Sequence, residues 1–157
     1  MTEVNGQQGY GSGPLKKKYK SVYNTFIGYD EKLSHIIYAG ADFLLMPSRV
    51  EPCGLNQMYS MRYGTAPVVH RTGGLADTVT DTTPETLENR TATGFSFTAP
   101  TATALQAAVT RALHHYQDPE AWQQIIANGM KQDFSWKRSA EQYLDLFEKV
   151  LAIRQHA

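Results

Sequence analysis

The sequence predicts an α/β fold in which a parallel sheet is covered by helices on both faces. Short apolar runs, typical of buried strands, alternate with longer amphipathic runs, typical of helices. Glycine-containing turns follow two of the apolar runs, as they do where a strand passes into a helix. Helical crossovers between strands make those strands parallel, and a buried parallel sheet needs a helical layer on each face.

The ends of the expected elements are set by side chains that begin or end helices. Asp30, Asp118 and Ser135 precede helical runs and can cap a helix N-terminus. Gly64 and Gly129 follow such runs and are expected to end them. The expected strands cover residues 22–28, 42–46, 66–70 and 94–97. The expected helices cover residues 30–39, 55–63, 76–79, 101–116, 118–128 and 135–151, and a polar surface loop covers residues 80–93.

Composition and charge narrow the class of protein. Among 157 residues, 15 basic and 15 acidic side chains give a formal net charge of zero, which argues against a nucleic acid or a membrane held by bulk charge. A single cysteine forms no internal disulfide, and no apolar run approaches the roughly 20 residues that span a bilayer. The start of the chain lacks the apolar core of a signal peptide. We expect a cytoplasmic protein, with a flexible leader over residues 1–20 and one domain over residues 21–157.

Residues 47–55, P-S-R-V-E-P-C-G-L, stand between an expected strand and an expected helix. This stretch carries a carboxylate, Glu51, the only cysteine, Cys53, and Gly54. The N–H groups of a helix's first turn are unpaired and carry partial positive charge, and a glycine lets a ligand approach them closely. The stretch therefore favours an anion or sugar-phosphate site, with Glu51 as a functional carboxylate or only a partner of the helix dipole.

Six motifs in a fixed order give the chain a family likeness. They are F-I-G-Y (26–29), S-H-x-I-Y-A-G-A-D (34–42), L-M-P-S-R-V-E-P-C-G-L-N-Q (45–57), M-R-Y-G-T (61–65), R-T-G-G-L-A-D-T-V (71–79) and D-F-S-W (133–136). With these motifs the chain resembles bacterial glycogen synthases and plant starch synthases. The resemblance implies a Rossmann-like partial C-terminal, nucleotide-sugar-binding domain of a GT-B glycosyltransferase. Such enzymes transfer glucose from ADP-glucose to the non-reducing end of an α-1,4-glucan with retention, and a plant relative would act in the plastid.

The resemblance also implies a role for individual residues. Glu51 matches the glutamate that holds the donor glucose and stabilises positive charge in the transition state, a task suited to a carboxylate. His70, the last residue of the expected strand 66–70, is a candidate neighbour of the sugar or a structural residue. The residues implied to bind the donor, from adenine to phosphates and sugar, are Tyr29, Cys53, Gly54, Leu55, Tyr59, Thr72, Gly73 and Gly74.

Parts of a complete synthase are missing from the motifs found. The sequence shows neither the K-x-G-G-L motif of an N-terminal acceptor domain nor the arginine and lysine that hold the donor phosphates. The resemblance implies no metal and no organic cofactor, with ADP-glucose, the glucan and the missing N-terminal domain as partners. Two alternatives stay open: a GT-B transferase of the UDP-glucose or sucrose type, and an inactive, binding-only fragment.

Overall fold

The computed structural model describes residues 3–4, 7–8, 15, 17–19 and 21–155. They fall into two compact units that divide between His35 and Ile36, inside helix α2 (Glu31–Gly40). In the first unit, strands β1 (Glu3–Val4) and β2 (Gln7–Gln8) pair with each other in antiparallel fashion. Much of the expected leader, residues 1–20, lies outside the described residues, so that boundary stays a prediction.

The expected strand over residues 22–28 is wrong. The structure assigns turns and irregular backbone there, and Val22 and Phe26 are 82% and 61% exposed. A strand is stable only where a neighbour accepts and donates its backbone hydrogen bonds. The two strands described in the first unit already pair with each other, so the apolar residues of this segment have no sheet to join.

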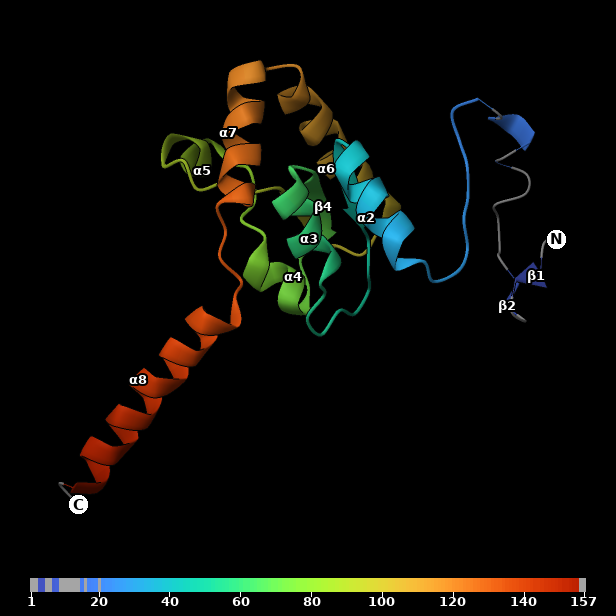
Figure 1. The fold of residues 1–157 in the computed structure, drawn as a ribbon. Coiled ribbons are helices and arrows are strands. Elements are labelled where there is room, and N and C mark those ends of the chain that lie inside the picture. The colour runs from blue at the N-terminus through green and yellow to red at the C-terminus, as the bar shows by residue number, and fades with distance from the viewer. Residues whose placement is uncertain (1–2, 5–6, 9–14, 16, 20, 156–157) are drawn as a thin grey trace. The chain divides into compact units, whose positions relative to one another are not determined.

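The second unit is built around a three-stranded parallel sheet (Figure 1). Its strands follow one another in sequence order: β3 (Phe43–Met46), β4 (Ala66–His70) and β5 (Phe95–Phe97). β4 is the central strand and all five of its residues are buried, as expected for a parallel strand covered on both faces. β3 pairs on one side only within the described residues, and Leu45 on this edge is 50% exposed.

Alternate residues of β4 bury the two faces of the sheet. Val68 packs in a core with residues of helices α6 (Ala102–Tyr116) and α7 (Pro119–Met130). Val69 packs in a second core with residues of helices α3 (Asn56–Tyr63) and α4 (Gly73–Thr78). A strand has a side-chain period of two, so the V-V pair supplies one residue to each core. The predicted fold class, helices on both faces of a parallel sheet, is confirmed.

The structure confirms most of the expected helix ends, but α4, expected over residues 76–79, begins earlier, at Gly73, and α7 continues past Gly129. The Asp30 carboxylate accepts from the Leu33 amide at 2.9 Å, and Asp118 accepts from the amides of Glu120 and Ala121 at the start of α7. Gly64 ends α3 with a left-handed φ of 83°. Gly129, however, lies inside α7 and is buried against Met61 of α3. Its small size serves helix packing and does not end the helix.

Residues 80–93 are more ordered than the expected surface loop. They contain helix α5 (Pro84–Glu88), which a Thr83–Thr86 capping box and a proline in the first turn begin. Thr82 and Thr93 are each 2% exposed, and their buried hydroxyls are hydrogen-bonded: Thr82 donates to the Gly94 carbonyl and Thr93 accepts from the Thr80 amide. The polar composition of the segment therefore reflects internal hydrogen bonding, and only part of it faces solvent.

Arg111 of α6 ties this segment to the sheet. Its guanidinium makes a two-bond ion pair with Asp81, at 2.9 and 3.2 Å, and donates to the carbonyls of Thr82 at 2.8 Å and Ser96 at 2.9 Å. The Asp81 carboxylate also accepts from the Ser96 amide at 2.6 Å. The Arg111 side chain thus satisfies acceptors in the 80–93 segment, at Asp81 and Thr82, and in strand β5, at Ser96.

We expect Arg111→Met to lower the free energy of unfolding by about 2 kcal/mol, because it leaves Asp81 and two carbonyls without their charged donor. Chemical denaturation of the 157-residue chain measures this value. The matched change Arg154→Met, at an exposed position of the last helix, is expected to change it by less than about 0.5 kcal/mol. Equal effects of the two changes would contradict the structural role of Arg111.

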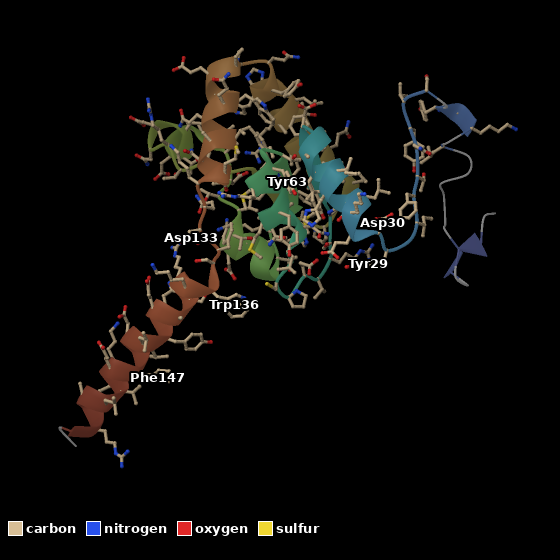
Figure 2. All side chains as sticks on the ribbon, viewed as in Figure 1. Tyr29, Asp30, Tyr63, Asp133, Trp136 and Phe147 are labelled. Carbon is tan, nitrogen blue, oxygen red and sulfur yellow. The ribbon has the colours of Figure 1, made fainter. Side chains whose placement is uncertain are left out.

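The last helix, α8 (Trp136–Gln155), begins directly after Ser135, as predicted. Its expected apolar face is exposed throughout the described chain, with Tyr143, Leu144 and Phe147 each 58–60% exposed. Figure 2 shows the Trp136 and Phe147 side chains projecting from this helix. Among the described helices, none is long and apolar enough to cross a bilayer.

Candidate functional site

Two loops at the carboxyl ends of β3 and β4 lie in direct backbone contact. The Gly74 amide donates to the carbonyl oxygens of Glu51 and Pro52, at 3.3 and 3.2 Å. A Cβ atom added to Gly73 would overlap the Glu51 carbonyl, and one added to Gly74 would overlap the Cys53 carbonyl. The 51–54 loop and the 72–74 loop, predicted separately to bind one donor, are therefore neighbours. Glycine is required in the second loop for the first to approach this closely.

The Glu51 carboxylate lies on this rim and is half-buried. The Ser48 hydroxyl is 3.4 Å from its Oε2 atom, a long hydrogen bond that orients one carboxylate oxygen. Glu51 forms no ion pair among the described residues. A carboxylate without a cationic partner at a strand's carboxyl end can accept hydroxyl groups and oppose a developing positive charge.

The N-terminus of α3 follows the 51–54 loop and has no side-chain cap. Leu55 is the N-cap residue and makes no capping hydrogen bond, and Gly54 before it has a left-handed φ of 73°. Within the described residues, the amides of Gly54, Leu55 and Asn56 have no recorded acceptor. Unpaired amides at a helix N-terminus are the groups that bind phosphate and other anions.

Gln57 is a residue of this region that sequence reasoning passed over. It is fully buried, and its amide nitrogen donates to the carbonyls of Cys53 at 3.1 Å and Gly54 at 3.0 Å. The same nitrogen lies 3.1 Å from the Thr78 hydroxyl of α4. A sequence signal existed, because Gln57 lies four residues before the buried Met61 and so belongs to the inner face of α3.

His70 joins the segments that follow all three strands. It is 7% exposed, with Nδ1 2.7 Å from the Ser48 carbonyl after β3 and Nε2 3.1 Å from the Thr98 carbonyl after β5. Its ring also packs on Phe97, with centroids 5.4 Å apart. Both ring nitrogens thus lie against backbone oxygens, which gives His70 a clear structural task. Its role as a neighbour of the sugar stays a prediction.

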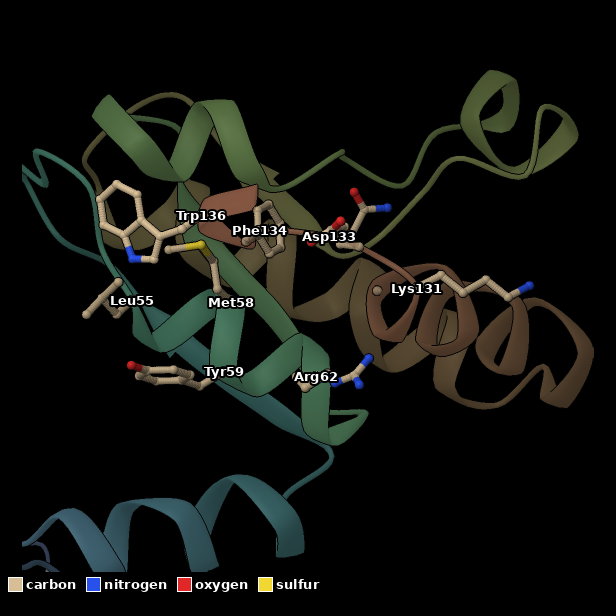
Figure 3. A pocket seen from close by; sticks show the side chains of 10 residues that line it. Leu55, Met58, Tyr59, Arg62, Lys131, Asp133, Phe134 and Trp136 are labelled. Atoms are coloured by element: carbon tan, nitrogen blue, oxygen red, sulfur yellow. The ribbon is translucent and has the colours of Figure 1, made fainter. Parts of the chain in front are cut away.

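Leu55 and Tyr59 line a pocket of about 510 Å³ between α3 and the segment that joins α7 to α8 (Figure 3). Trp136, which is 88% exposed, also lines this pocket. Neither Glu51 nor the 72–74 loop lines it. The pocket therefore adjoins the helix end of the candidate site and is separate from the carboxylate.

The remaining predicted residues are placed as follows. Cys53 is a free, exposed thiol. Tyr59 lies near Tyr38, with ring centroids 6.3 Å apart. Burial, together with the neighbouring Tyr59 phenol, raises the pKa of Tyr38. Tyr29 lies in the first unit and is 91% exposed. Its place at the adenine stays a prediction.

In the described part of the chain, no group of three His, Cys, Asp or Glu side chains is arranged to hold a metal ion. The chemistry visible at the site is therefore that of a carboxylate, of unpaired backbone amides and of two glycine-dependent loops. Groups of this kind at the carboxyl edge of a parallel sheet are suited to binding a sugar phosphate.

Comparison with known proteins identifies the family to which this chain belongs. Residues 15–132 match the family model described as glycosyl transferases group 1, and the chain belongs to this family. It is 54% identical over 138 residues to the glycogen synthase of Thioalkalivibrio sulfidiphilus. Among solved structures it is similar to the catalytic domain of starch synthase IV from Arabidopsis thaliana, bound to ADP and acarbose, with a TM-score of 0.76 and 38% identity. A second similar structure is sucrose-phosphate synthase from Thermosynechococcus elongatus, with a TM-score of 0.60 and 28% identity.

The chain is shorter than the proteins it matches. The matches to the bacterial glycogen synthase and to the plant starch synthase each include 88% of this chain, but only 29% of the length of the relative. The predicted resemblance to glycogen and starch synthases is confirmed, and the relatives contain further residues that have no counterpart in this chain.

Proposed function

We propose that this chain supplies the donor-binding part of a glycogen synthase, which transfers glucose from ADP-glucose to an α-1,4-glucan with retention. The observation that carries the proposal is the contact between the 51–54 and 72–74 loops at the end of α3. It brings a carboxylate and unpaired amides to one rim, in a chain that is 54% identical to a bacterial glycogen synthase. The proposed reaction takes place in the cytoplasm of a bacterium, or in the plastid if the source is a plant, and uses no metal or organic cofactor.

The proposed roles follow from the groups present. The amides of Gly54 and Leu55 face the donor phosphates, where backbone donors stabilise the charge that develops on the leaving ADP. Glu51 accepts from the glucose hydroxyls and opposes the oxocarbenium-like centre. The sugar side of the donor site is closed by Thr72, Gly73 and Gly74, and Cys53 contributes its backbone. On the nucleoside side of the donor, Tyr59 lies toward the nucleoside and Tyr29 stacks on the adenine.

The binding site for the acceptor glucan, and the arginine and lysine for the donor phosphates, come in this proposal from the part of the enzyme that the relatives have in addition. The chain alone is then expected to be inactive in glucan elongation. The donor is ADP-glucose, and the alternative transferase of the UDP-glucose or sucrose type is not favoured by the relatives.

A chimeric synthase tests this proposal. In it, the present chain replaces the stretch that it matches in the Thioalkalivibrio sulfidiphilus glycogen synthase. We expect the chimeric synthase to elongate glycogen from ADP-glucose at a rate within about tenfold of the unmodified enzyme. We expect it to use UDP-glucose far less well, because uracil has one ring and adenine two, and a pocket formed for one base leaves its polar groups unpaired with the other. A chimeric synthase that melts cooperatively but transfers no glucose would contradict the proposal.

A further inference from the structure

Gln57 is a polar side chain at the base of the candidate site, and it cannot touch the donor because it is fully buried. Its amide nitrogen donates to two successive carbonyls, those of Cys53 and Gly54, and reaches the Thr78 hydroxyl. All three partners belong to the two loops of the site or to the helix that continues one of them. The side chain therefore acts on the geometry of the loops and not on a ligand.

The two carbonyl contacts determine where the neighbouring amides point. In a trans peptide the C=O and N–H bonds of one planar unit point in opposite directions, and no described peptide bond is cis. With the Cys53 carbonyl held toward Gln57, the Gly54 amide must point away from the protein interior. With the Gly54 carbonyl held in the same way, the Leu55 amide points outward too.

Thr78 extends this arrangement to the second loop. Its hydroxyl donates to the Gly74 carbonyl at 2.6 Å and so faces the Gln57 amide nitrogen as an acceptor. The two hydrogens of that amide are shared among the Thr78 hydroxyl and the Cys53 and Gly54 carbonyls. The chain of hydrogen bonds Gln57–Thr78–Gly74 links α3 to the 72–74 loop, which itself donates from Gly74 to the Glu51 carbonyl. Movement of either loop relative to the other would break at least one of these bonds.

The oxygen of the Gln57 side-chain amide shows that this arrangement lowers the stability of the fold. Its Oε1 atom is buried and has no partner among the described residues. Turning the amide over would place Oε1 against two carbonyl oxygens, so the nitrogen must face them. Oε1 then faces Gly54, and a Cβ atom added to Gly54 would lie 2.6 Å from it. A buried acceptor without a donor destabilises a fold. An apolar side chain of similar size would avoid that cost and would lose control of the loops.

From these contacts we propose that Gln57 is a positioning residue for the donor diphosphate. It holds the Gly54 and Leu55 amides outward, at the place where negative charge develops as the sugar leaves, and through Thr78 it keeps the 72–74 loop in register with them. The proposal rests on the proposed function, and it assigns to a buried amide a task in transition-state stabilisation.

The test compares three variants of the chimeric synthase. Gln57→Leu removes the contacts with Cys53, Gly54 and Thr78. Gln57→Glu keeps the shape but replaces the donor with an acceptor, and Thr78→Val cuts only the link to the second loop. We expect Gln57→Leu and Gln57→Glu to lower kcat/KM for ADP-glucose by about 10- to 100-fold, and Thr78→Val by a smaller factor. The KM for glycogen is expected to stay within about twofold of its unmodified value, which a general loss of structure would not allow.

Gln123→Leu is the matched control, because Gln123 is an exposed glutamine in the middle of α7. It is expected to leave both constants unchanged. Unchanged kcat/KM for ADP-glucose in folded Gln57→Leu and Gln57→Glu variants would overturn the inference, as would equal losses for donor and glycogen. If the unmodified chimeric synthase melts cooperatively but is inactive, the proposed function fails first, so the two failures are distinguishable.

Discussion

Glu51→Ala in the chimeric synthase is expected to lower kcat by about 10³-fold or more, with little change in the melting temperature. The carboxylate is half-buried on the rim, and its one recorded side-chain hydrogen bond is the 3.4 Å contact from Ser48. Its removal therefore costs the fold little. It removes the negative charge that opposes the oxocarbenium-like centre in the transition state, so most of the loss is expected in turnover.

Two further variants separate the charge of Glu51 from its size. Glu51→Gln keeps the size and hydrogen-bonding capacity but not the charge, and we expect it to remain within about tenfold of the alanine variant because the charge supplies most of the effect. Glu141→Ala, an exposed glutamate of α8, is the control and is expected to keep normal turnover. Near-normal turnover of Glu51→Ala, measured by glucose incorporation at saturating ADP-glucose, would remove Glu51 from the catalytic role.

The elements that the sequence predicts well are those in which local chemistry and burial agree. Strand β4 occupies the predicted residues 66–70, since an apolar run between two glycine-marked turns has few alternatives. The contact between the two loops also follows from the order of the strands. β3 and β4 are parallel neighbours, and their carboxyl ends must meet at one edge of the sheet.

The elements that the sequence does not predict depend on partners far along the chain. Residues 22–28 have strand composition, but a strand forms only beside another strand, and the composition does not report whether one is present. Gly129 resembles a helix stop, but its environment is decided by Met61, which is 68 positions away. Helix α5 is not predicted from the sequence, although Thr83 and Pro84 are ordinary signals for a helix start. The reason is that a segment without apolar periodicity is typical of a loop.

The site shows the same division. Motif resemblance finds residues that can touch a ligand, such as Glu51 and Gly54, because these are short-range features of the loop. It does not find Gln57, whose importance comes from hydrogen bonds to Thr78, 21 positions later. It also does not decide the orientation of His70, which depends on carbonyls that follow two other strands. Supporting contacts are tertiary, and they become visible only when the sheet is assembled.

Gly74→Ala is the second substitution for which we expect a large effect. It is expected to lower both the stability of the fold and the activity of the enzyme. Gly74 is buried, and the added Cβ would overlap the carbonyl group and the Cα atom of Cys53. These atoms belong to the backbone, which cannot rotate away as a flexible side chain can. The 51–54 and 72–74 loops must therefore separate, and the hydrogen bonds from Gly74 to Glu51 and Pro52 are lost with the contact.

We expect Gly74→Ala to lower the free energy of unfolding of the 157-residue chain by about 3 kcal/mol or more, measured by chemical denaturation. The control is Gly40→Ala at the end of α2, where an added Cβ meets no atom within 4 Å. There the change is expected to be neutral or stabilising by up to about 1 kcal/mol, because alanine favours the helix. In the chimeric synthase, Gly74→Ala is also expected to lower kcat/KM for ADP-glucose about 100-fold, since a displacement of about 1 Å in positioning groups has effects of that size. A stable Gly74→Ala variant with normal donor kinetics would show that the two loops do not need their close contact, and would contradict the geometry on which the donor site is built.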